Sequence, residues 1–204
     1  MNLFPMFLKL EERRCLVVGA GAIGEEKIRG LLHRGADVQV VAPKATHRVR
    51  AWARAGMIHW QARRFRPADL RRMFLVVAAT SSHALHEKIF GEAKRRAVLC
   101  NIADDPAHCD FYYGAVVQRG SLQIAISTGG HSPALAQRLR KQLESQFGPE
   151  YKDWLEALKE ARGKLFARAI PADRRKRLLH RLASPRAFKE FVRQRKGKIS
   201  SARH

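Results

Sequence analysis

A glycine-rich turn between an apolar run and a helical stretch is the feature that most limits what this chain can fold into. Residues 13–19 end in Cys-Leu-Val-Val-Gly, a continuous apolar run of the kind that forms a parallel strand covered on both faces. The next glycines complete the spacing G-x-G-x-x-G, and apolar residues then recur on one helical face over residues 22–33. The pattern predicts a strand, a tight turn and a helix.

Each glycine of this turn has a separate expected task. Gly19 permits the sharp turn, Gly21 lets a pyrophosphate approach the backbone, and Gly24 lets the helix pack closely on the sheet. The N–H groups of Ala22 and Ile23 then point at the phosphates, aided by the positive end of the helix dipole. We therefore predict a dinucleotide site here. The alternative is a strand–turn–helix unit without a ligand.

Further strand and helix patterns alternate along the first half of the chain. Apolar runs predict strands at 37–42, 57–61, 73–80 and 98–102, and helical patterns lie at 44–55 and 82–95. This alternation predicts an α/β fold, a doubly wound parallel sheet of the Rossmann type, over residues 1–110.

The pattern changes near residue 110. Two strands, 111–118 and 122–127, are predicted to form a hairpin through Arg119-Gly120-Ser121. An amphipathic helix follows to about residue 147. We therefore divide the chain into residues 1–110, a small strand–helix segment at 111–148, and a helical, basic C-terminal region at 149–204. Residues 196–204 are expected to be frayed.

Charge and cysteine content limit the partners. The formal net charge of +22 attracts polyanions such as nucleic acid, an acidic membrane or a polycarboxylate ligand, although a solvated basic surface is the plain alternative. No apolar run is long enough for a transmembrane helix, and the first residues do not resemble a signal peptide, so a cytoplasmic protein is expected. Cys15, Cys100 and Cys109 form no disulfide or zinc pattern, and we expect buried thiols at Cys15 and Cys100.

The ends of the predicted strands supply the other candidate cofactor contacts. The second strand usually ends in an acidic residue that binds the adenosine ribose, but Pro43 and Lys44 stand there. A basic residue also suits a 2′-phosphate, so the residues alone leave NAD and NADP open. Thr80 and Ser81 follow the fourth strand and can contact the cofactor, or Ser81 or Ser82 can cap the next helix.

Two acidic residues, Asp104 and Asp105, follow the fifth strand. An aspartate beside the nicotinamide can accept a proton as a hydride leaves. The alternative is a solvated Asp-Asp-Pro turn. His108 lies in the same loop and is either a proton carrier, a metal contact or an ordinary loop histidine.

A second candidate anion site precedes the amphipathic helix. Its residues are Thr128, Gly129, His131 and Ser132, and Pro133 opens the helix. Glycines at a helix N-terminus favour anion binding, whereas a Ser N-cap followed by proline explains the same residues without a ligand. Both can hold together. We expect no resident metal site.

Taken in order, these motifs resemble the precorrin-2 dehydrogenase/sirohydrochlorin ferrochelatase family, which includes the N-terminal module of siroheme synthase. The resemblance covers residues 3–147. It rests on Leu-Phe-Pro-Met-Phe at 3–7, Cys-Leu-Val-Val-Gly-Ala-Gly at 15–21, Val-Ala-Pro at 41–43, Cys-Asn at 100–101, and the segment 122–133 with Ser-Thr-Gly-Gly-His-Ser-Pro. Gly114, where the family often has proline, and Thr128, where some members carry serine, depart from it.

The resemblance implies an NAD-dependent oxidation of precorrin-2 to sirohydrochlorin in siroheme biosynthesis. By motif match, Asp104 is the general acid/base, and 22–23 and 43–44 bind NAD. It also implies a homodimer, with 111–148 as the dimerisation region and the helical tail over the active-site cleft. Some members also insert Fe²⁺, with Asp104 and His131 as candidates to assist. A tetrapyrrole polycarboxylate as substrate is a candidate explanation for the basic charge, and a solvated face is the alternative for most of the basic residues.

A rival function is a dinucleotide-sensing protein that binds nucleic acid. It would need aromatic side chains interleaved with the basic residues. The aromatic residues of the tail are expected to be core positions instead: Tyr151, Trp154, Phe166, Phe188 and Phe191. Nucleic acid and membranes are therefore not expected as partners.

Overall fold

The computed structural model describes residues 3–201, and the chain divides into two compact units that meet between Tyr113 and Gly114. Each unit is described by itself. Over the described residues, no helix combines the length and apolarity needed to cross a membrane.

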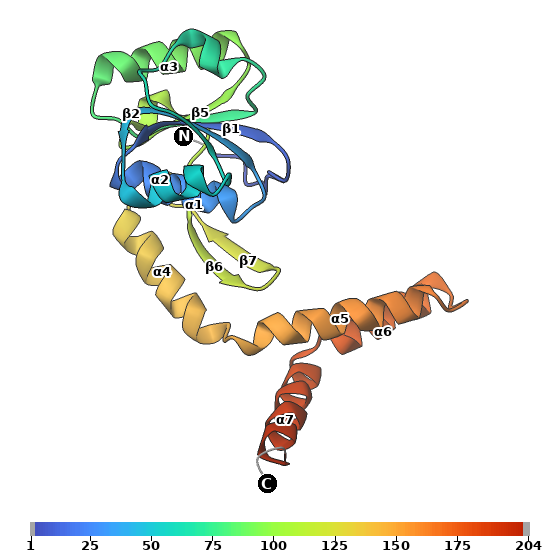
Figure 1. Cartoon of the computed structure of the whole chain (residues 1–204). Coiled ribbons are helices and arrows are strands. Elements are labelled where there is room, and N and C mark those ends of the chain that lie inside the picture. The colour runs from blue at the N-terminus through green and yellow to red at the C-terminus, as the bar shows by residue number, and fades with distance from the viewer. Residues whose placement is uncertain (1–2, 202–204) are drawn as a thin grey trace. The chain divides into compact units, whose positions relative to one another are not determined.

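The first unit is a five-stranded parallel sheet with helices on both faces. Its strands are β1 (Arg14–Ala20), β2 (Asp37–Ala45), β3 (His59–Gln61), β4 (Leu75–Ala78) and β5 (Leu99–Ile102), in the order β3-β2-β1-β4-β5. Helices α1 (Ala22–Leu32) and α2 (His47–Arg54) cover one face and α3 (His83–Arg95) the other (Figure 1). Short 3-10 turns lie at Pro67–Leu70 and Pro106–His108. The predicted doubly wound fold is confirmed.

Strand β1 shows why an apolar run forms this sheet. Val17 packs in the core beneath α1 and α2, while Leu16 and Val18 pack in the core beneath α3. Successive side chains of a strand point to opposite faces, so a strand covered on both faces needs apolar residues throughout. Since β1 pairs with β2 on one side and β4 on the other, the strand order reverses beside it, which is where ligands bind in such sheets.

The second strand is longer than expected. The sequence predicted a strand to residue 42 and a helix from 44, but β2 continues to Ala45 and α2 begins at His47. Thr46 caps α2, because its hydroxyl oxygen accepts a hydrogen bond from the Val49 amide at 3.2 Å. The predicted helix start was therefore wrong, and Pro43 and Lys44 lie in a strand.

The second unit begins with the predicted hairpin and continues as helices, but the first strand starts at Ala115 rather than at residue 111 and includes Arg119, which was expected in the turn. Strands β6 (Ala115–Arg119) and β7 (Leu122–Ile126) pair antiparallel, with Gly120 in the turn at φ +60°. The helices are α4 (Pro133–Gln146), α5 (Glu150–Phe166), α6 (Ala172–Leu182) and α7 (Pro185–Ser201). The Arg119 guanidinium joins hairpin and helix, since it donates to the carbonyls of Phe147 (2.8 Å) and Glu144 (3.1 Å) at the end of α4.

Two expectations for the tail were partly wrong. Tyr151, Trp154 and Phe188 do pack together. Phe166, however, is 52% exposed, and the guanidinium groups of Arg162 and Arg175 each lie over its ring. The segment 196–204 was expected to be frayed, but residues 196–201 continue α7. Residues 202–204 lie outside the described residues. The three-way division of the chain stays a prediction.

Candidate active site

The glycine turn between β1 and α1 is shaped by backbone contacts that exclude a side chain at two positions. Gly19 has φ +101°, and a β-carbon there would lie 2.1 Å from the carbonyl oxygen of Ala79, just after β4. At Gly24, a β-carbon would lie 2.2 Å from the carbonyl oxygen of Gly19. Both distances are far inside van der Waals contact, so these glycines are required by packing of the chain on itself.

Gly21 differs from the other two. A β-carbon at Gly21 would meet no atom of the described residues within 4 Å, so its glycine leaves open space beside the start of α1. Gly21 is the N-cap of that helix and has no side chain to occupy the helix's first N–H groups. Ile23, in the first turn of α1, is 48% exposed. This cradle, which a β-carbon would fill, fits the pyrophosphate of a dinucleotide.

The end of β2 is exposed at Pro43 and Lys44, as the cofactor prediction requires. An acidic side chain does reach this region, but from α1: Glu25 accepts hydrogen bonds from the Thr46 hydroxyl at 2.7 Å and from Arg48 at 3.3 Å. These contacts tie the start of α2 to α1. Sequence reasoning missed them, because the residues lie far apart along the chain.

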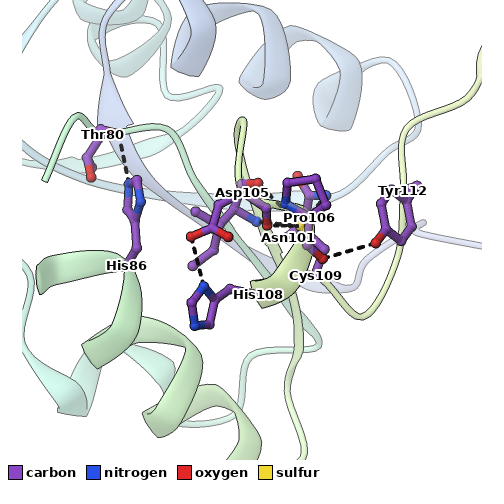
Figure 2. Close-up of polar contacts among 9 residues, drawn as sticks. Thr80, His86, Asn101, Asp105, Pro106, His108, Cys109 and Tyr112 are labelled. Carbon is purple, nitrogen blue, oxygen red and sulfur yellow. Dashed lines mark hydrogen bonds and ion pairs between the residues drawn. The ribbon is translucent and has the colours of Figure 1, made fainter. Parts of the chain in front are cut away.

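Thr80 has a buried hydroxyl oxygen without a hydrogen-bond partner in the described part of the chain. Its backbone carbonyl accepts a hydrogen bond from His86 Nε2 at 2.8 Å (Figure 2). Buried polar groups are nearly always satisfied, so this hydroxyl beside the glycine turn is a candidate contact for a ligand. Ser82 is the N-cap of α3, as one alternative predicted, but its side chain makes no capping hydrogen bond.

The two aspartates after β5 have different surroundings. Asp104 has φ +62°, a left-handed conformation that few residues with a side chain adopt, and its side chain is exposed. The carboxylate of Asp105 is held by His108, whose Nδ1 lies 2.8 Å from Oδ2. This hydrogen bond is the main reason that the pKa of Asp105 is lowered. Asp104 is therefore the carboxylate of the pair that remains exposed at the sheet edge.

Side chains fasten both ends of the loop that carries Asp104, and two of them, Asp110 and Tyr112, were missed by sequence reasoning (Figure 2). Asp110 accepts the Cys100 amide at 2.9 Å, and Asn101 donates to the Phe111 carbonyl at 2.8 Å. Cys109 Sγ accepts a hydrogen bond from the Ile102 amide at 3.2 Å. The Tyr112 hydroxyl donates a hydrogen bond to the Pro106 carbonyl at 3.0 Å. These bonds hold the backbone that keeps Asp104 left-handed.

Two of the thiols are inert. Cys15 and Cys100 are fully buried, and burial raises the pKa of each thiol to about 12. Burial thus disfavours the thiolate, which is the reactive form of cysteine. The prediction of buried thiols at these two positions is confirmed.

The candidate anion residues lie together in the second unit. The Ser132 hydroxyl accepts the Leu135 amide at 3.2 Å, with Pro133 at the first helical position, so the N-cap expectation is confirmed. The Thr128 hydroxyl accepts a hydrogen bond from the Ser132 amide at 3.1 Å. Gly129 lies beside the His131 ring and has a left-handed backbone, with φ +60°. Anion binding at Thr128, Gly129, His131 and Ser132 stays a prediction.

Comparison with known proteins matches most of the chain. Residues 6–115 match the family described as "Putative NAD(P)-binding", and residues 119–146 match "Sirohaem biosynthesis protein central". The siroheme synthase of Mannheimia succiniciproducens is 40% identical over 145 residues, which is 71% of this chain and 30% of that protein. The siroheme synthase of Neisseria meningitidis serogroup C is 40% identical over 156 residues, 76% of this chain and 32% of that protein. The chain thus spans about a third of the length of these curated relatives.

A solved structure matches almost from end to end. SirC, a precorrin-2 dehydrogenase, has a TM-score of 0.79 and 29% sequence identity, and the match covers 94% of this chain and 98% of SirC. The resemblance stated from the motifs is confirmed. The chain therefore belongs to the family described as "Putative NAD(P)-binding", and it is similar to the siroheme synthases and to SirC.

Proposed function

We propose that this protein is an NAD-dependent precorrin-2 dehydrogenase, which oxidises precorrin-2 to sirohydrochlorin in siroheme biosynthesis. The observation that carries this proposal is the near-complete structural match to SirC at 29% identity. The siroheme synthases support the same pathway, but this chain matches only about a third of their length, so the proposed activity is drawn from SirC.

The cofactor is held by residues at the reversal point of the sheet. In this proposal the N–H groups of Ala22 and Ile23 bind the pyrophosphate beside Gly21, and Pro43 and Lys44 contact the adenosine half. The unpartnered hydroxyl of Thr80 and the neighbouring Ser81 face the other half of the cofactor. NAD supplies the hydride acceptor. We prefer NAD to NADP on the family resemblance of the segment containing Pro43 and Lys44.

Asp104 is the residue proposed to handle the proton. The oxidation removes a hydride and a proton from precorrin-2. The exposed carboxylate of Asp104 takes the proton and passes it to solvent, which regenerates the base. Its place on a loop fastened at Asn101 and Asp110 supports this role, because a fixed backbone keeps the carboxylate at one position.

The substrate and the subunit arrangement complete the proposal. We assign the substrate's carboxylates to the start of α4, where Thr128, Gly129, His131 and Ser132 lie. A homodimer through residues 111–148 is proposed on the family resemblance. The proposed location is the cytoplasm.

The nucleic-acid alternative finds less support. The aromatic side chains near the basic tail pack against one another at Tyr151, Trp154 and Phe188, and so do not form a stacking surface. Phe166 is the exception. A dehydrogenase that also inserts Fe²⁺ into sirohydrochlorin is a closer alternative, with Asp104 and His131 as candidates to assist.

One assay separates the dehydrogenase activity from the chelatase activity. Purified protein is incubated with precorrin-2 and NAD, and absorbance follows the appearance of sirohydrochlorin and NADH; Fe²⁺ or Co²⁺ is added only after oxidation is complete. We expect oxidation in the first stage. Its absence, with correctly folded protein, would contradict the proposal, and a further spectral change in the second stage would identify chelation as a separate activity.

A further inference from the structure

We propose that His83, His86 and Asp105 form a binding site for one divalent transition-metal ion. The two histidines lie three residues apart on α3, and Asp105 comes from the loop after β5, all within the first unit. Each residue offers one ligand atom, and these three atoms all lie within 4.8 Å of one another. Small rotations of the exposed His83 and of the Asp105 carboxylate bring them to one ion.

His86 provides the strongest sign that a ligand belongs here. Its Nε2 lies 2.8 Å from the carbonyl oxygen of Thr80, which can only accept, so Nε2 carries the proton (Figure 2). Nδ1 then holds the free lone pair of the neutral ring. The residue is 4% exposed, and Nδ1 has no hydrogen-bond partner in the part of the chain that the structure describes. A buried nitrogen with a fixed, unused lone pair is prepared to bind a metal ion.

The surroundings of the ligands match those of known metal sites. A ligating histidine usually donates its other N–H to a carbonyl or carboxylate, which fixes the ring and its tautomer. The Thr80 carbonyl does this for His86. His108 does the equivalent for Asp105, since its Nδ1 holds Oδ2 at 2.8 Å and leaves the other oxygen for the ion.

The ligand types select the kind of metal. Two imidazole nitrogens and one carboxylate oxygen suit Zn²⁺, Fe²⁺ or Co²⁺, and they leave coordination positions open for water or a substrate atom. Mg²⁺ and Ca²⁺ prefer oxygen ligands throughout. The alternative is that Asp105 only accepts the hydrogen bond from His108, in which case no ion binds.

The test measures metal binding without any substrate or NAD, so it does not depend on the proposed dehydrogenase activity. Untagged full-length protein is freed of metal and titrated with Co²⁺, followed by its visible absorption, and then with Zn²⁺ in competition. We expect one ion per chain. His83→Ala and Asp105→Asn should each weaken binding by about tenfold or more, because even outer partners of a ligand contribute that much.

The controls separate ligand loss from unfolding. His33→Ala removes an exposed histidine at the end of α1 and should leave Co²⁺ affinity unchanged. His86→Gln removes the buried ligand, so its fold is checked by circular dichroism and thermal unfolding before metal is added, and it too should weaken Co²⁺ binding. Absence of Co²⁺ binding by the native protein, or equal binding by native protein, His83→Ala and Asp105→Asn, would overturn the proposal.

Discussion

The carbonyl oxygen of Ala79 occupies the place that a side chain on Gly19 would need, since a β-carbon there would lie 2.1 Å from it. The end of β4 therefore passes directly against the turn after β1. Glycine is therefore required at position 19 by the neighbouring strand as well as by its own turn. At Gly24, the carbonyl of Gly19 likewise leaves no room for a side chain. Gly19 and Gly24 are thus required by packing, whereas Gly21 is not, and substitutions can distinguish these two roles.

Alanine at each glycine should give two distinct outcomes. Gly19→Ala and Gly24→Ala must displace backbone, so we expect each to lower stability by about 1–3 kcal/mol or more, seen as a lower Tm. Gly21→Ala meets no described atom and has φ −77°, so its stability should be nearly unchanged while NADH affinity falls. Thermal unfolding and NADH fluorescence titration measure the two effects. Equal destabilisation by all three would contradict this separation.

Asp104→Asn tests the proposed proton acceptor. Asparagine tolerates a left-handed backbone and keeps the size of the side chain, but it cannot accept the proton. We expect NAD binding and Tm to be retained and the rate of precorrin-2 oxidation to fall by about 10²–10⁴-fold. Asp173→Asn, at an exposed position in the first turn of α6, is the matched control and should keep full activity. An active Asp104→Asn or Asp104→Ala enzyme would remove the assignment.

Thr80→Val tests whether the orphan hydroxyl contacts the cofactor. Valine has nearly the same shape, and the hydroxyl it replaces has no partner in the described residues, so the protein should lose no stability. NADH affinity should fall. Thr46→Val is the contrasting control: its hydroxyl caps α2 and donates to Glu25, so this variant should lose about 1 kcal/mol of stability. Unchanged NADH affinity in Thr80→Val would show that the hydroxyl does not bind the cofactor.

The ion pair between Asp69 and Arg63 predicts a pH-dependent contribution to stability. Burial alone would raise the pKa of Asp69, but hydrogen bonds from the Arg63 guanidinium (2.6 and 2.9 Å) and the Arg66 amide (2.8 Å) outweigh it and lower that pKa. A carboxyl whose pKa is lower in the folded state stabilises the fold above its unfolded pKa of about 3.9. That stabilisation is lost as the pH falls through the folded pKa.

Asp69→Asn should therefore be destabilised at pH 7, by about 1.5–3 kcal/mol for hydrogen bonds to a charged group. The difference from the native protein should shrink as the pH falls below about 3.9. Urea unfolding at several pH values measures it, with Asp173→Asn as the exposed control. A difference that stays constant down to the lowest pH would mean that packing, rather than charge, explains the loss.

The sequence predicted the first unit well because its signals are local. A strand buried on both faces requires an unbroken apolar run, as in Leu16–Val17–Val18, and a tight turn to a helix requires glycine. The error at β2 has the opposite origin. Its last residues stay extended because Ala45 pairs with Ala20 of another strand, and that pairing is invisible to a window along the chain.

By itself, the sequence determined the alternating α/β fold, the glycine turn and its family, because periodicity, glycine spacing and motif order are properties of the chain as written. Only the tertiary structure decided that Asp105 is paired with His108 while Asp104 is exposed. It also decided that the Thr80 hydroxyl has no partner among the described residues, and that His86 hydrogen-bonds a carbonyl through Nε2 while its Nδ1 has no partner there. The physical reason is that hydrogen bonding and burial of a side chain depend on atoms brought in from other elements, which adjacent residues do not specify.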